Sequence, residues 1–376
     1  MRIISVETKP LRIPYNKPFH WAQGVIEAAE VILVSVHTDE GITGYGESVS
    51  SASAAAVQSF LHEAGALCIG RSPFEITALL RKAYQHLFAA RGNCSAPRFG
   101  ALVLAGLDMA LWDVAGKATG RAVHELLGGA VRDRIQYFGF PQGDTADEVA
   151  AEAKQWADSG YDVIYVKIGR GDALDLAIAE QVRASIGNKR LRLDANEAWS
   201  PLTAMRMIKA LSRFDIEVVE QPTVSDSLAA LEQVKRSSLV AIAADQLVFT
   251  PEDVYSVCRQ QAADLIVLGL HETGGIGRFR KAAAIAEAAG INVCLHGLYE
   301  TGITTCATNQ VGATLVNLDD GNQYMNHLLV EDIVKMPQLA LEKGQLPVLP
   351  GPGLGFELDW DAVKRAERAY REFSLR

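Results

Sequence analysis

Three acidic residues end strand-like segments of this chain at nearly equal intervals. They are Asp194 in RLRLDAN, Glu220 in DIEVVEQP and Asp245 in VAIAADQ, and Lys167 in DVIYVKIG lies one interval earlier. The successive intervals of 27, 26 and 25 residues each fit one strand, one helix and two loops, which is the repeat of a βα barrel. Because the carboxyl ends of the strands in such a barrel surround a common centre, we expect three carboxylates and one amine to converge.

Carboxylates that converge repel one another unless a cation neutralises them. A site made of carboxylate oxygens suits a hard divalent ion such as Mg²⁺. The alternative is that each acid is an ordinary strand-end residue or a helix cap. Three acids in phase, each after an apolar run, favour the metal site.

Length and composition limit the class of protein. The chain has 376 residues, enough for a barrel plus a smaller unit, and its 49% hydrophobic content supports a large core. A net charge of −9 without a basic cluster argues against nucleic acid and against an anionic membrane as partners. A small anionic substrate remains compatible with this charge, because a bound metal ion reverses the local field.

The cysteines and the amino-terminal segment bear on the compartment. An odd number of cysteines without metal-ligand spacing favours reduced thiols, as in the cytosol. They are Cys68, Cys94, Cys258, Cys294 and Cys306. The first residues, MRIISVETKPLRIPY, lack the apolar core and cleavage site of a signal peptide. We also expect no stretch long enough to span a bilayer, and therefore a cytoplasmic protein.

The periodicity of apolar residues changes along the chain. Residues 1 to about 50 alternate like an antiparallel meander of about three strands, and residues 53 to about 127 have helical periodicity. From residue 135 onward short apolar strands alternate with amphipathic helices. The predicted division is an α+β domain over 1–127, a barrel over 128–345, and a segment over 346–376 that returns to the first domain.

The expected barrel strands are short and apolar. They are residues 135–138, 163–167, 191–194, 216–220, 240–244, 265–268, 292–295 and 314–318. Right-handed crossovers between them would close the sheet into a barrel.

Seven motifs are spread over almost the whole chain. They are GYGE at 44–47, ALWDVAGKATGRAVHELLGG at 110–129, VKIG at 166–169, LDAN, VEQP, HETGGIGR and HGLYETGI. As a set they resemble the enolase superfamily, and more narrowly its mandelate racemase and muconate lactonizing branch. AADQ at 243–246 and YETGI at 299–303 look closer to the muconate lactonizing subgroup.

This resemblance implies a fold and an activity. The fold is an α/β protein in which an N-terminal α+β capping domain closes over a modified TIM (β/α)7β barrel. Asp194, Glu220 and Asp245 would hold Mg²⁺, and the shared step is removal of a proton next to a carboxylate, giving an enediolate that the metal stabilises. A homo-oligomer, either a dimer or an octamer, is expected by resemblance only.

Lys167 matches the second lysine of the family's paired-lysine motif, and we expect it to be the base. Its alternative role is a structural partner of the acids.

The first lysine of the pair is replaced by Tyr165, which cannot supply the same positive charge. Gly269 stands where the family has its second acid/base, so nothing at that position can move a proton. Gln246 stands where the subgroup often has Glu.

One residue is a candidate to compensate for Gly269. His296, at the end of the seventh strand, titrates near neutral pH and would deliver or accept a proton. A buried imidazole that only hydrogen-bonds to the backbone is the alternative. His271 is a second candidate for the same duty. Glu300 matches a family acid, although a helix cap is the alternative.

Other residues fall where the family's specificity loops lie. The residues expected to contact the substrate are Tyr15, His20, Trp21, Tyr165, Asn196, His271, Glu300 and Asn322. Ser50 to Ser53 lie in a second such loop, and Gln323 and His327 lie in the polar segment around Asn322. Interdomain packing and surface loops are the alternatives.

The leading hypothesis is a Mg²⁺-dependent enzyme on a small carboxylic acid, with Lys167 and His296 as its catalytic residues. One principal base favours an isomerase of the cycloisomerase kind. Dehydration of a hydroxy acid or acid sugar, a lyase reaction, is the first alternative. A carboxylate-binding barrel without turnover is the second, and an aldolase or phosphate-binding lyase is disfavoured because no Gly-rich phosphate loop is present.

Overall fold

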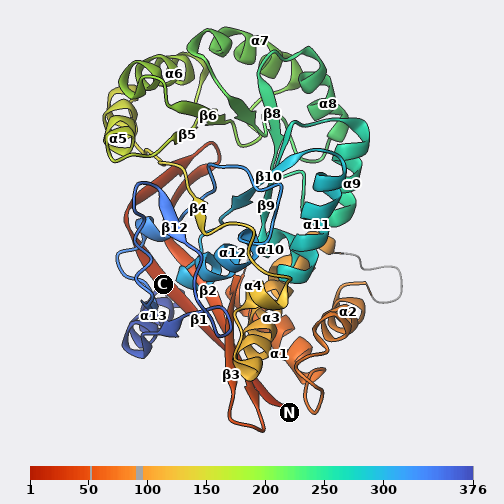
Figure 1. The fold of residues 1–376 in the computed structure, drawn as a ribbon. Helices are drawn as coiled ribbons and strands as arrows, with labels where there is room; N and C mark the ends of the chain where they lie inside the picture. Colours follow the sequence, from red (N-terminus) through yellow and green to blue (C-terminus); the bar gives the residue numbers. More distant parts are fainter. Residues whose placement is uncertain (51–52, 90–95, 376) are drawn as a thin grey trace.

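An α+β unit and a curled parallel sheet make up the two halves of the molecule (Figure 1). The computed structural model describes residues 1–50, 53–89 and 96–375. The α+β unit contains β1 (Ile3–Trp21), β2 (Gly24–Thr38), β3 (Thr43–Val49), α1 (Ala54–Ala66), α2 (Ile76–Leu87), α3 (Pro97–Thr119) and α4 (Val123–Leu126). Its strands form an antiparallel sheet in the order β1-β2-β3, which confirms the predicted meander.

Helix α3 corrects one expectation from the sequence. It has 23 residues and contains an 18-residue window with a mean hydropathy of 1.5, so by length and composition alone it could cross a membrane. Of its most apolar 18-residue window, 89% is buried inside the structure, and the helix packs against β3. Close approach explains the glycines of GYGE: a Cβ on Gly46 would lie 2.2 Å from the carbonyl oxygen of Gly106 in α3. The apolar run is therefore a core helix.

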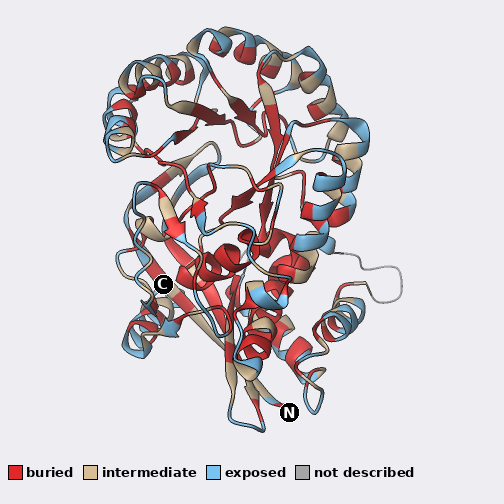
Figure 2. Cartoon of the chain, in the orientation of Figure 1, coloured by how far each residue is buried: buried red, intermediate tan, exposed pale blue. Residues whose placement is uncertain are grey.

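The second half is a six-stranded parallel sheet in the order β10-β9-β8-β7-β6-β5. Its helices lie on the outer side of the curl (Figure 1), and its strands are buried (Figure 2). The strands are β5 (Val163–Lys167), β6 (Arg190–Asp194), β7 (Val218–Glu220), β8 (Ala241–Ala244), β9 (Leu265–Gly269) and β10 (Asn292–His296). The helices are α5 (Ala146–Asp158), α6 (Asp172–Ile186), α7 (Pro201–Leu211), α8 (Leu228–Ser237), α9 (Pro251–Gln260), α10 (Leu270–Thr273), α11 (Ile276–Ala288) and α12 (Gly302–Gly312).

The two outermost predicted strands differ in the structure. The segment 135–138 forms β4 (Arg134–Gln136), which pairs antiparallel with β12 (Gln345–Pro347). The segment 314–318 is not a strand: after α12 the chain turns, and only Leu318 makes a parallel bridge, to Val293. Single parallel bridges Gly139–Ile164 and Tyr137–Asn322 complete the links between the edges of the sheet. Apolar residues that follow a buried helix, such as 314–318, look like a strand in the sequence.

The C-terminal segment packs onto the α+β unit. It contains β11 (Val334–Met336), β13 (Glu357–Leu358) and α13 (Trp360–Ser374), and β11 pairs with β13. Helix α13 lies against β1, where the guanidinium of Arg12 is 4.3 Å from the ring centre of Phe373. Two short 3₁₀ turns, Ser212–Phe214 and Asn326–Leu328, complete the structure.

Two buried carboxylates join the halves near the carboxyl ends of the sheet strands. Glu47 of β3 accepts hydrogen bonds from the backbone N–H groups of Thr301 and Thr304, at 3.0 and 2.9 Å, at the start of α12. Asp108 of α3 accepts one from Ile276 N–H at 3.0 Å, at the start of α11. Helix N-termini favour negative charge, so each contact offsets part of the cost of burying its carboxyl group between the halves. Gly275 permits the second one, because a Cβ there would lie 2.3 Å from Asp108.

The Asp108 contact predicts a pH dependence of stability. Burial raises the pKa of Asp108 from 3.8 to about 7, and the N–H groups of Ile276 and Gly277 lower it only in part. The folded carboxyl binds its proton more tightly than the unfolded one, so its contribution to stability declines as pH rises. We expect this decline to be about 1.4 kcal/mol per pH unit between roughly pH 4 and 7.

Asp108→Asn keeps an acceptor oxygen and is expected to remove that decline. The measurement is urea unfolding in steps across this pH range, compared with the wild type. Asp361→Asn, at an exposed site, serves as the matched control and should leave the profile unchanged. Identical pH profiles for the wild type and Asp108→Asn would contradict the assignment.

Candidate active site

Neighbouring strands place Lys167, Asp194 and Glu220 in one row across the sheet. Lys167 is the register partner of Asp194, and Asp194 is the register partner of Glu220. Asp245 directly follows β8, the next strand. One carboxylate oxygen from each of the three acids lies within 4.8 Å of the others, and all three residues are buried. The convergence predicted from the spacing is therefore confirmed.

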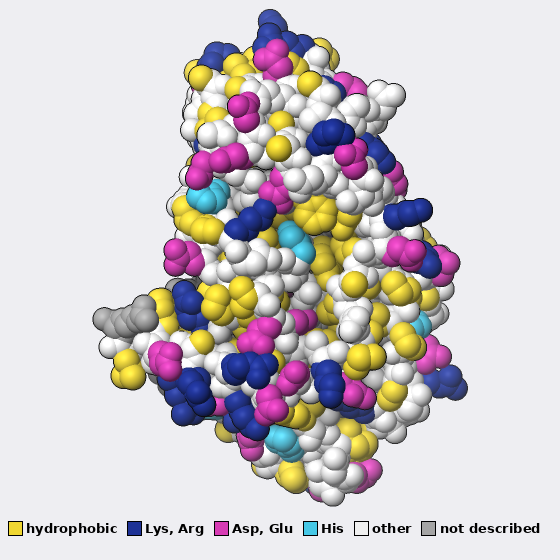
Figure 3. All heavy atoms as spheres, turned by 90° about the vertical axis from the view of Figure 1, so that its left-hand side faces the viewer, with side chains coloured by type: hydrophobic (Ala, Val, Ile, Leu, Met, Phe, Trp, Pro, Cys, Tyr) yellow, Lys and Arg dark blue, Asp and Glu magenta, His cyan; other side chains and the backbone are white. Residues whose placement is uncertain are grey.

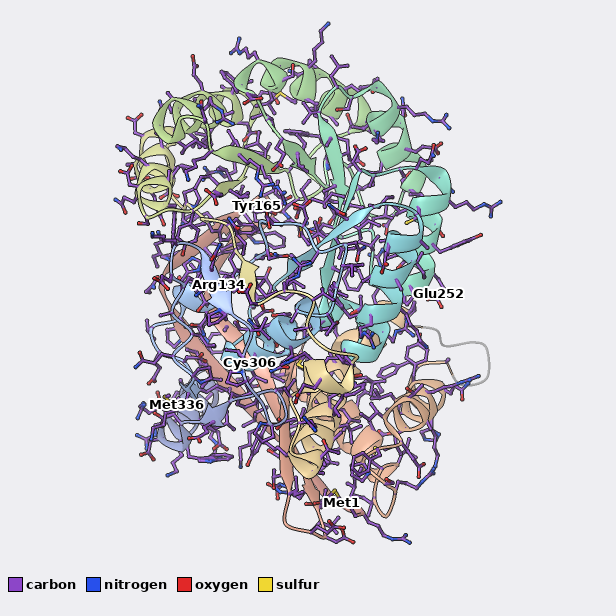
Figure 4. The ribbon with its side chains drawn as sticks, in the orientation of Figure 1. Met1, Arg134, Tyr165, Glu252, Cys306 and Met336 are labelled. Carbon is purple, nitrogen blue, oxygen red and sulfur yellow. The ribbon has the colours of Figure 1, made fainter. Side chains whose placement is uncertain are left out.

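Tyr165 donates to the acids from within the same strand as Lys167. It lies in the sheet half of the molecule (Figure 4), and its hydroxyl is 2.5 Å from Asp194 Oδ2 and 2.8 Å from Glu220 Oε1. The single hydroxyl proton of Tyr165 is therefore shared between carboxylate oxygens of two acids. Burial, followed by the charges of Asp194 and Asp245, raises the pKa of Glu220 well above its ordinary value. Phe138 stacks on the Tyr165 ring at 4.2 Å.

Asp245 is the least satisfied of the three acids. Among the described residues, neither of its carboxylate oxygens has a hydrogen-bond partner. Burial raises its pKa from 3.8 to about 7, although nearby His296 lowers it. Buried carboxylate oxygens without donors are costly unless a cation meets them. The donor set, three carboxylates and no sulfur, fits a hard divalent ion such as Mg²⁺.

Lys167 lies at the Asp194 end of the row. Its Nζ is 2.5 Å from Asp194 Oδ2, and the residue is 6% exposed. Aromatic rings of Phe19 and Phe140 lie 6.0 and 5.9 Å from the ammonium group. Phe19 belongs to β1, so the long first strand reaches over the sheet and shields this amine from water.

His296 lies at the Asp245 end of the row. Its Nδ1 is 3.6 Å from Asp245 Oδ1 and 2.9 Å from Glu272 Oε2. Burial by itself lowers the pKa of His296, but the charges of Asp245 and Glu272 outweigh it and raise the pKa to about 10. The imidazole is therefore held as a cation by two carboxylates, which is more than a backbone hydrogen bond.

Glu272 is a residue that the sequence analysis missed. A Cβ built on Gly269 would lie 2.3 Å from Glu272 Oε2, so the Glu272 carboxylate occupies the space of a side chain at Gly269. The helical turn α10 brings residue 272 back over residue 269, as i and i+3 positions on a helix do. An acidic group therefore lies in the space that Gly269 leaves open, although residue 269 itself carries no acid or base. The signal was present in the sequence as the acid of HETGGIGR.

Two other predicted acid/base residues lie behind this row. His271 is buried, and its Nε2 is 2.9 Å from Thr304 Oγ1. Burial, then the charge of His296, lowers the pKa of His271 to about 3, so it is neutral. Glu300 accepts a hydrogen bond from Leu298 N–H at 2.6 Å, and burial raises its pKa well above the ordinary value. Thr301, not Glu300, caps α12.

The three residues of β1 that were predicted to contact the substrate lie in different surroundings. Trp21 lines a cavity of about 370 Å³ that also reaches His296 and Glu272. His20 instead lies 3.1 Å from Asp144 as an ion pair when its ring is protonated. Tyr15 is 7% exposed and packs in the core, and no hydrogen-bond partner of its hydroxyl lies in the described part of the chain.

The polar residues predicted around the strand ends mostly serve the backbone. The side chain of Asn322 accepts from Leu295 N–H and donates to the carbonyl oxygens of Gln136 and Asp319. Both amide hydrogens and one lone pair of its oxygen are thus used within the sheet half. The side chain of Gln323 accepts from Gly297 N–H at 3.2 Å. His327 stacks on the ring of Tyr324.

Asn196 and the second loop complete the predicted set. Asn196 N–H donates to Asp194 Oδ1 at 2.8 Å, and its own Oδ1 is buried without a partner in the described ranges. Ser50 lines the cavity beside Trp21, and Ser53 caps α1. Residues 51 and 52 lie outside the described residues.

Metal binding is testable without activity, through the stability of an Asp245→Asn variant. In EDTA the variant is expected to melt at a higher temperature than the wild type, because one of three repelling buried charges is gone. In excess Mg²⁺ the order should reverse, because a tightly bound ion stabilises the wild type by about 2.7 kcal/mol at a concentration 100 times its Kd.

Differential scanning calorimetry measures both arms of this comparison. Asp158→Asn, at an exposed position, is the control and should respond to Mg²⁺ like the wild type. Equal Mg²⁺ stabilisation of the wild type and Asp245→Asn would show that the ion binds elsewhere.

Comparison with known proteins assigns this geometry to a family. Residues 3–128 match the mandelate racemase/muconate lactonizing enzyme N-terminal domain, and residues 148–362 match the enolase C-terminal domain-like model. Muconate cycloisomerase 1 of Rhodococcus opacus is 32% identical over 377 residues, which cover 97% of this chain and 98% of that protein. L-Ala-D/L-Glu epimerase of Bacillus subtilis (strain 168) is 33% identical over 319 residues, 82% of this chain and 84% of that protein.

A solved structure extends the match to three dimensions. Dipeptide epimerase from Enterococcus faecalis V583, complexed with Mg and the dipeptide L-Leu-L-Tyr, aligns with a TM-score of 0.87 at 28% identity. The alignment covers 95% of this chain and 100% of that chain. The resemblance seen in the motifs is confirmed: the chain is an enzyme of the enolase superfamily and belongs to its mandelate racemase/muconate lactonizing family.

Proposed function

We propose that this enzyme is a Mg²⁺-dependent isomerase that removes a proton from the carbon next to a carboxylate and supplies a proton to form the product. One observation carries the proposal. A lysine and a carboxylate-paired histidine stand at opposite ends of a row of three buried carboxylates, Lys167 beside Asp194 and His296 beside Asp245. Two proton-transfer groups then flank the place where a carboxylate substrate meets the metal.

Each residue has a distinct role in this proposal. Asp194, Glu220 and Asp245 hold Mg²⁺, which when bound supplies the positive charge that favours loss of the α-proton. Lys167 takes the proton from one face of the carbon. His296 donates from the other, with its Nδ1 held by Glu272 and its Nε2 left for the substrate.

The His296–Glu272 pair supports one type of isomerisation over another. Cycloisomerisation, which the sequence favoured, needs only Lys167. Inversion at the α-carbon needs a proton donor on each face, and the pair supplies the second one. We therefore favour epimerisation or racemisation over cycloisomerisation. Both activities occur in the names of relatives of this chain, muconate cycloisomerase and L-Ala-D/L-Glu epimerase.

Dehydration is the second candidate, favoured by the same imidazolium. His296 lines the cavity and pairs with Glu272, so it is placed to protonate a departing hydroxyl group of a hydroxy acid. Loss of water would distinguish this outcome from an isomerisation by product mass.

Tyr165 belongs to the metal site rather than to the substrate site in this proposal. A neutral hydroxyl replaces the first lysine of the pair and holds Asp194 and Glu220 in place. Without that second ammonium group, the charge of the three carboxylates is met by Lys167, His296 and the metal.

The larger organisation follows the family resemblance. The bridges Gly139–Ile164, Tyr137–Asn322 and Val293–Leu318 support closure of the curled sheet into a modified (β/α)7β barrel. We assign residues 1–127 to a capping domain, 128–345 to the barrel and 346–376 to a segment on the cap. A cytoplasmic homo-oligomer, dimer or octamer, acting on a small carboxylate, completes the proposal.

Hydrogen exchange in D₂O tests the reaction directly. Candidate acids are incubated with Mg²⁺ and enzyme, and NMR follows the α-hydrogen of both stereoisomers. We expect deuterium in the product and inversion at the α-carbon. Lys167→Ala should slow exchange from one stereoisomer by about 10²- to 10⁴-fold, and His296→Asn should do the same for the other.

Control variants and contrary outcomes distinguish inversion from cycloisomerisation and from binding without turnover. Lys364→Ala and His86→Asn, both exposed, should exchange like the wild type. Exchange on one face only, without inversion, would support the cycloisomerase reading and reject the two-sided one. If no carboxylate exchanges and Lys167→Ala keeps full ligand affinity, the enzyme proposal fails in favour of binding without turnover.

A further inference from the structure

The cavity beside His296 carries information about the substrate. Its volume of about 370 Å³ falls in the usual range for small-molecule sites. Both the α+β unit and the sheet half contribute to its wall, so it lies where the cap meets the catalytic row. On the face drawn in Figure 3, hydrophobic side chains also gather in the middle third of the molecule, between these two halves.

The wall of this cavity is mainly apolar. Its large apolar side chains come from four parts of the chain: β1 and β2, α3, the segment after β8, and the segment after β10. They are Trp21, Ile26, Leu102, Phe249, Leu298 and Tyr299. An apolar wall of this kind stabilises a bulky apolar group and offers few partners to a chain of hydroxyl groups.

The charged groups of the wall are already paired. Glu30 lies 3.2 Å from Arg12, and Glu272 lies 2.9 Å from His296. The described residues that line the cavity include no lysine or arginine, and His296 is committed to the reacting carbon in the proposed function. A second carboxylate on the substrate would therefore meet Glu30 and Glu272 rather than a free cation.

One polar atom in the wall lacks a partner. Oε1 of Gln246 is buried, and within the described ranges no donor reaches it. Gln246 directly follows Asp245 in the sequence and lines the same cavity as Glu272 and His296. A buried acceptor without a donor is costly, and a ligand N–H or O–H would remove that cost.

We infer that the substrate is a monocarboxylic acid with a bulky uncharged apolar group and a hydrogen-bond donor, an amide N–H or a hydroxyl, near the reacting carbon. This inference rests on the proposed function for the position of the reacting carbon. It selects N-acyl or peptide-like amino acids with apolar side chains, and aryl-substituted hydroxy acids. It excludes unsaturated dicarboxylates and acid sugars as preferred substrates.

A paired assay tests the inference separately from the function. The Mg²⁺-loaded wild type is given three sets of acids: apolar monocarboxylates, dicarboxylates and acid sugars. We expect kcat/KM for α-hydrogen exchange to be at least about tenfold higher for the first set. Preference for dicarboxylates or acid sugars would overturn the inference while leaving the proposed function intact.

Binding to Mg²⁺-loaded Lys167→Ala, followed by calorimetry, is the second arm. It does not depend on turnover, so apolar monocarboxylates should still bind more tightly than the other sets. If they bind no better than acid sugars, the inference fails even where no substrate is found. Absence of exchange with retained selective binding would instead count against the proposed function alone.

Wall variants identify the cavity as the site of selectivity. Phe249→Ala and Leu298→Ala truncate half-buried side chains, so the fold should persist. Each is expected to raise KM for apolar monocarboxylates about tenfold with little change in kcat, since the lost contact is the same in the ground and transition states. Leu239→Ala, at a 99% exposed leucine, is the control and should change neither constant.

Arg98 is a nearby cation that could bind a second carboxylate of a substrate, which is the main alternative to the inference. The guanidinium of Arg98 lies 4.8 Å from the ring centre of Phe249. If dicarboxylates are preferred and Arg98→Ala abolishes that preference, Arg98 binds a second carboxylate and the inference is wrong. An unchanged preference for apolar acids in Arg98→Ala supports it.

Discussion

Repulsion among three buried carboxylates is the constraint on which the rest of the structure depends. Asp194, Glu220 and Asp245 converge because three parallel strands end side by side, and burial raises the pKa of two of them. Such a cluster stays ionised only beside positive charge. The chain places the amine of Lys167 at one end, the ring of His296 at the other and a phenol hydroxyl between two of the acids. In the proposed function, a divalent cation would complete the neutralisation, because the three carboxylates offer it a set of hard oxygen ligands.

Buried carboxylates also join the α+β unit to the sheet half. Glu47 and Asp108 are buried carboxylates as well, but each meets the N-terminus of a helix instead of a cation. Helix α11 follows α10, the turn that carries Glu272, and helix α12 follows β10, the strand that carries His296. Docking of the cap and placement of the histidine therefore share the same helix starts. A substitution at Glu47 or Asp108 should therefore displace His296 more than Lys167.

Much of this arrangement could be predicted from the sequence, for a physical reason. The βα repeat fixes which residues end successive strands, so Lys167 and the three acids could be placed in one row before any coordinates. The repeat carries no information about where a helix turn returns the chain. Glu272 was missed because it reaches the position of Gly269 through α10, three residues on, and not along the strand. The predicted strand at 314–318 failed because apolar residues after a buried helix look like a strand.

The contacts that individual side chains make were the hardest feature to predict from the sequence. Asn322 looked like a substrate contact as a polar residue after the last strand, yet its amide is used by Leu295, Gln136 and Asp319. Tyr15 and Trp21 are six residues apart in one strand, and only Trp21 reaches the cavity because β1 is irregular between Pro14 and Phe19. Local irregularities of this kind decide specificity, and hydrophobic periodicity does not encode them.

A crystal structure of the wild type soaked with Mn²⁺ and a slowly reacting carboxylate tests the central claim most directly. Anomalous scattering locates the ion without reference to activity. The account predicts one peak bonded to an oxygen from each of Asp194, Glu220 and Asp245 at about 2.0–2.2 Å, with the substrate α-carbon between Lys167 Nζ and the His296 ring. A peak bonded to fewer than two of these acids, or an α-carbon with both groups on one side, would contradict it.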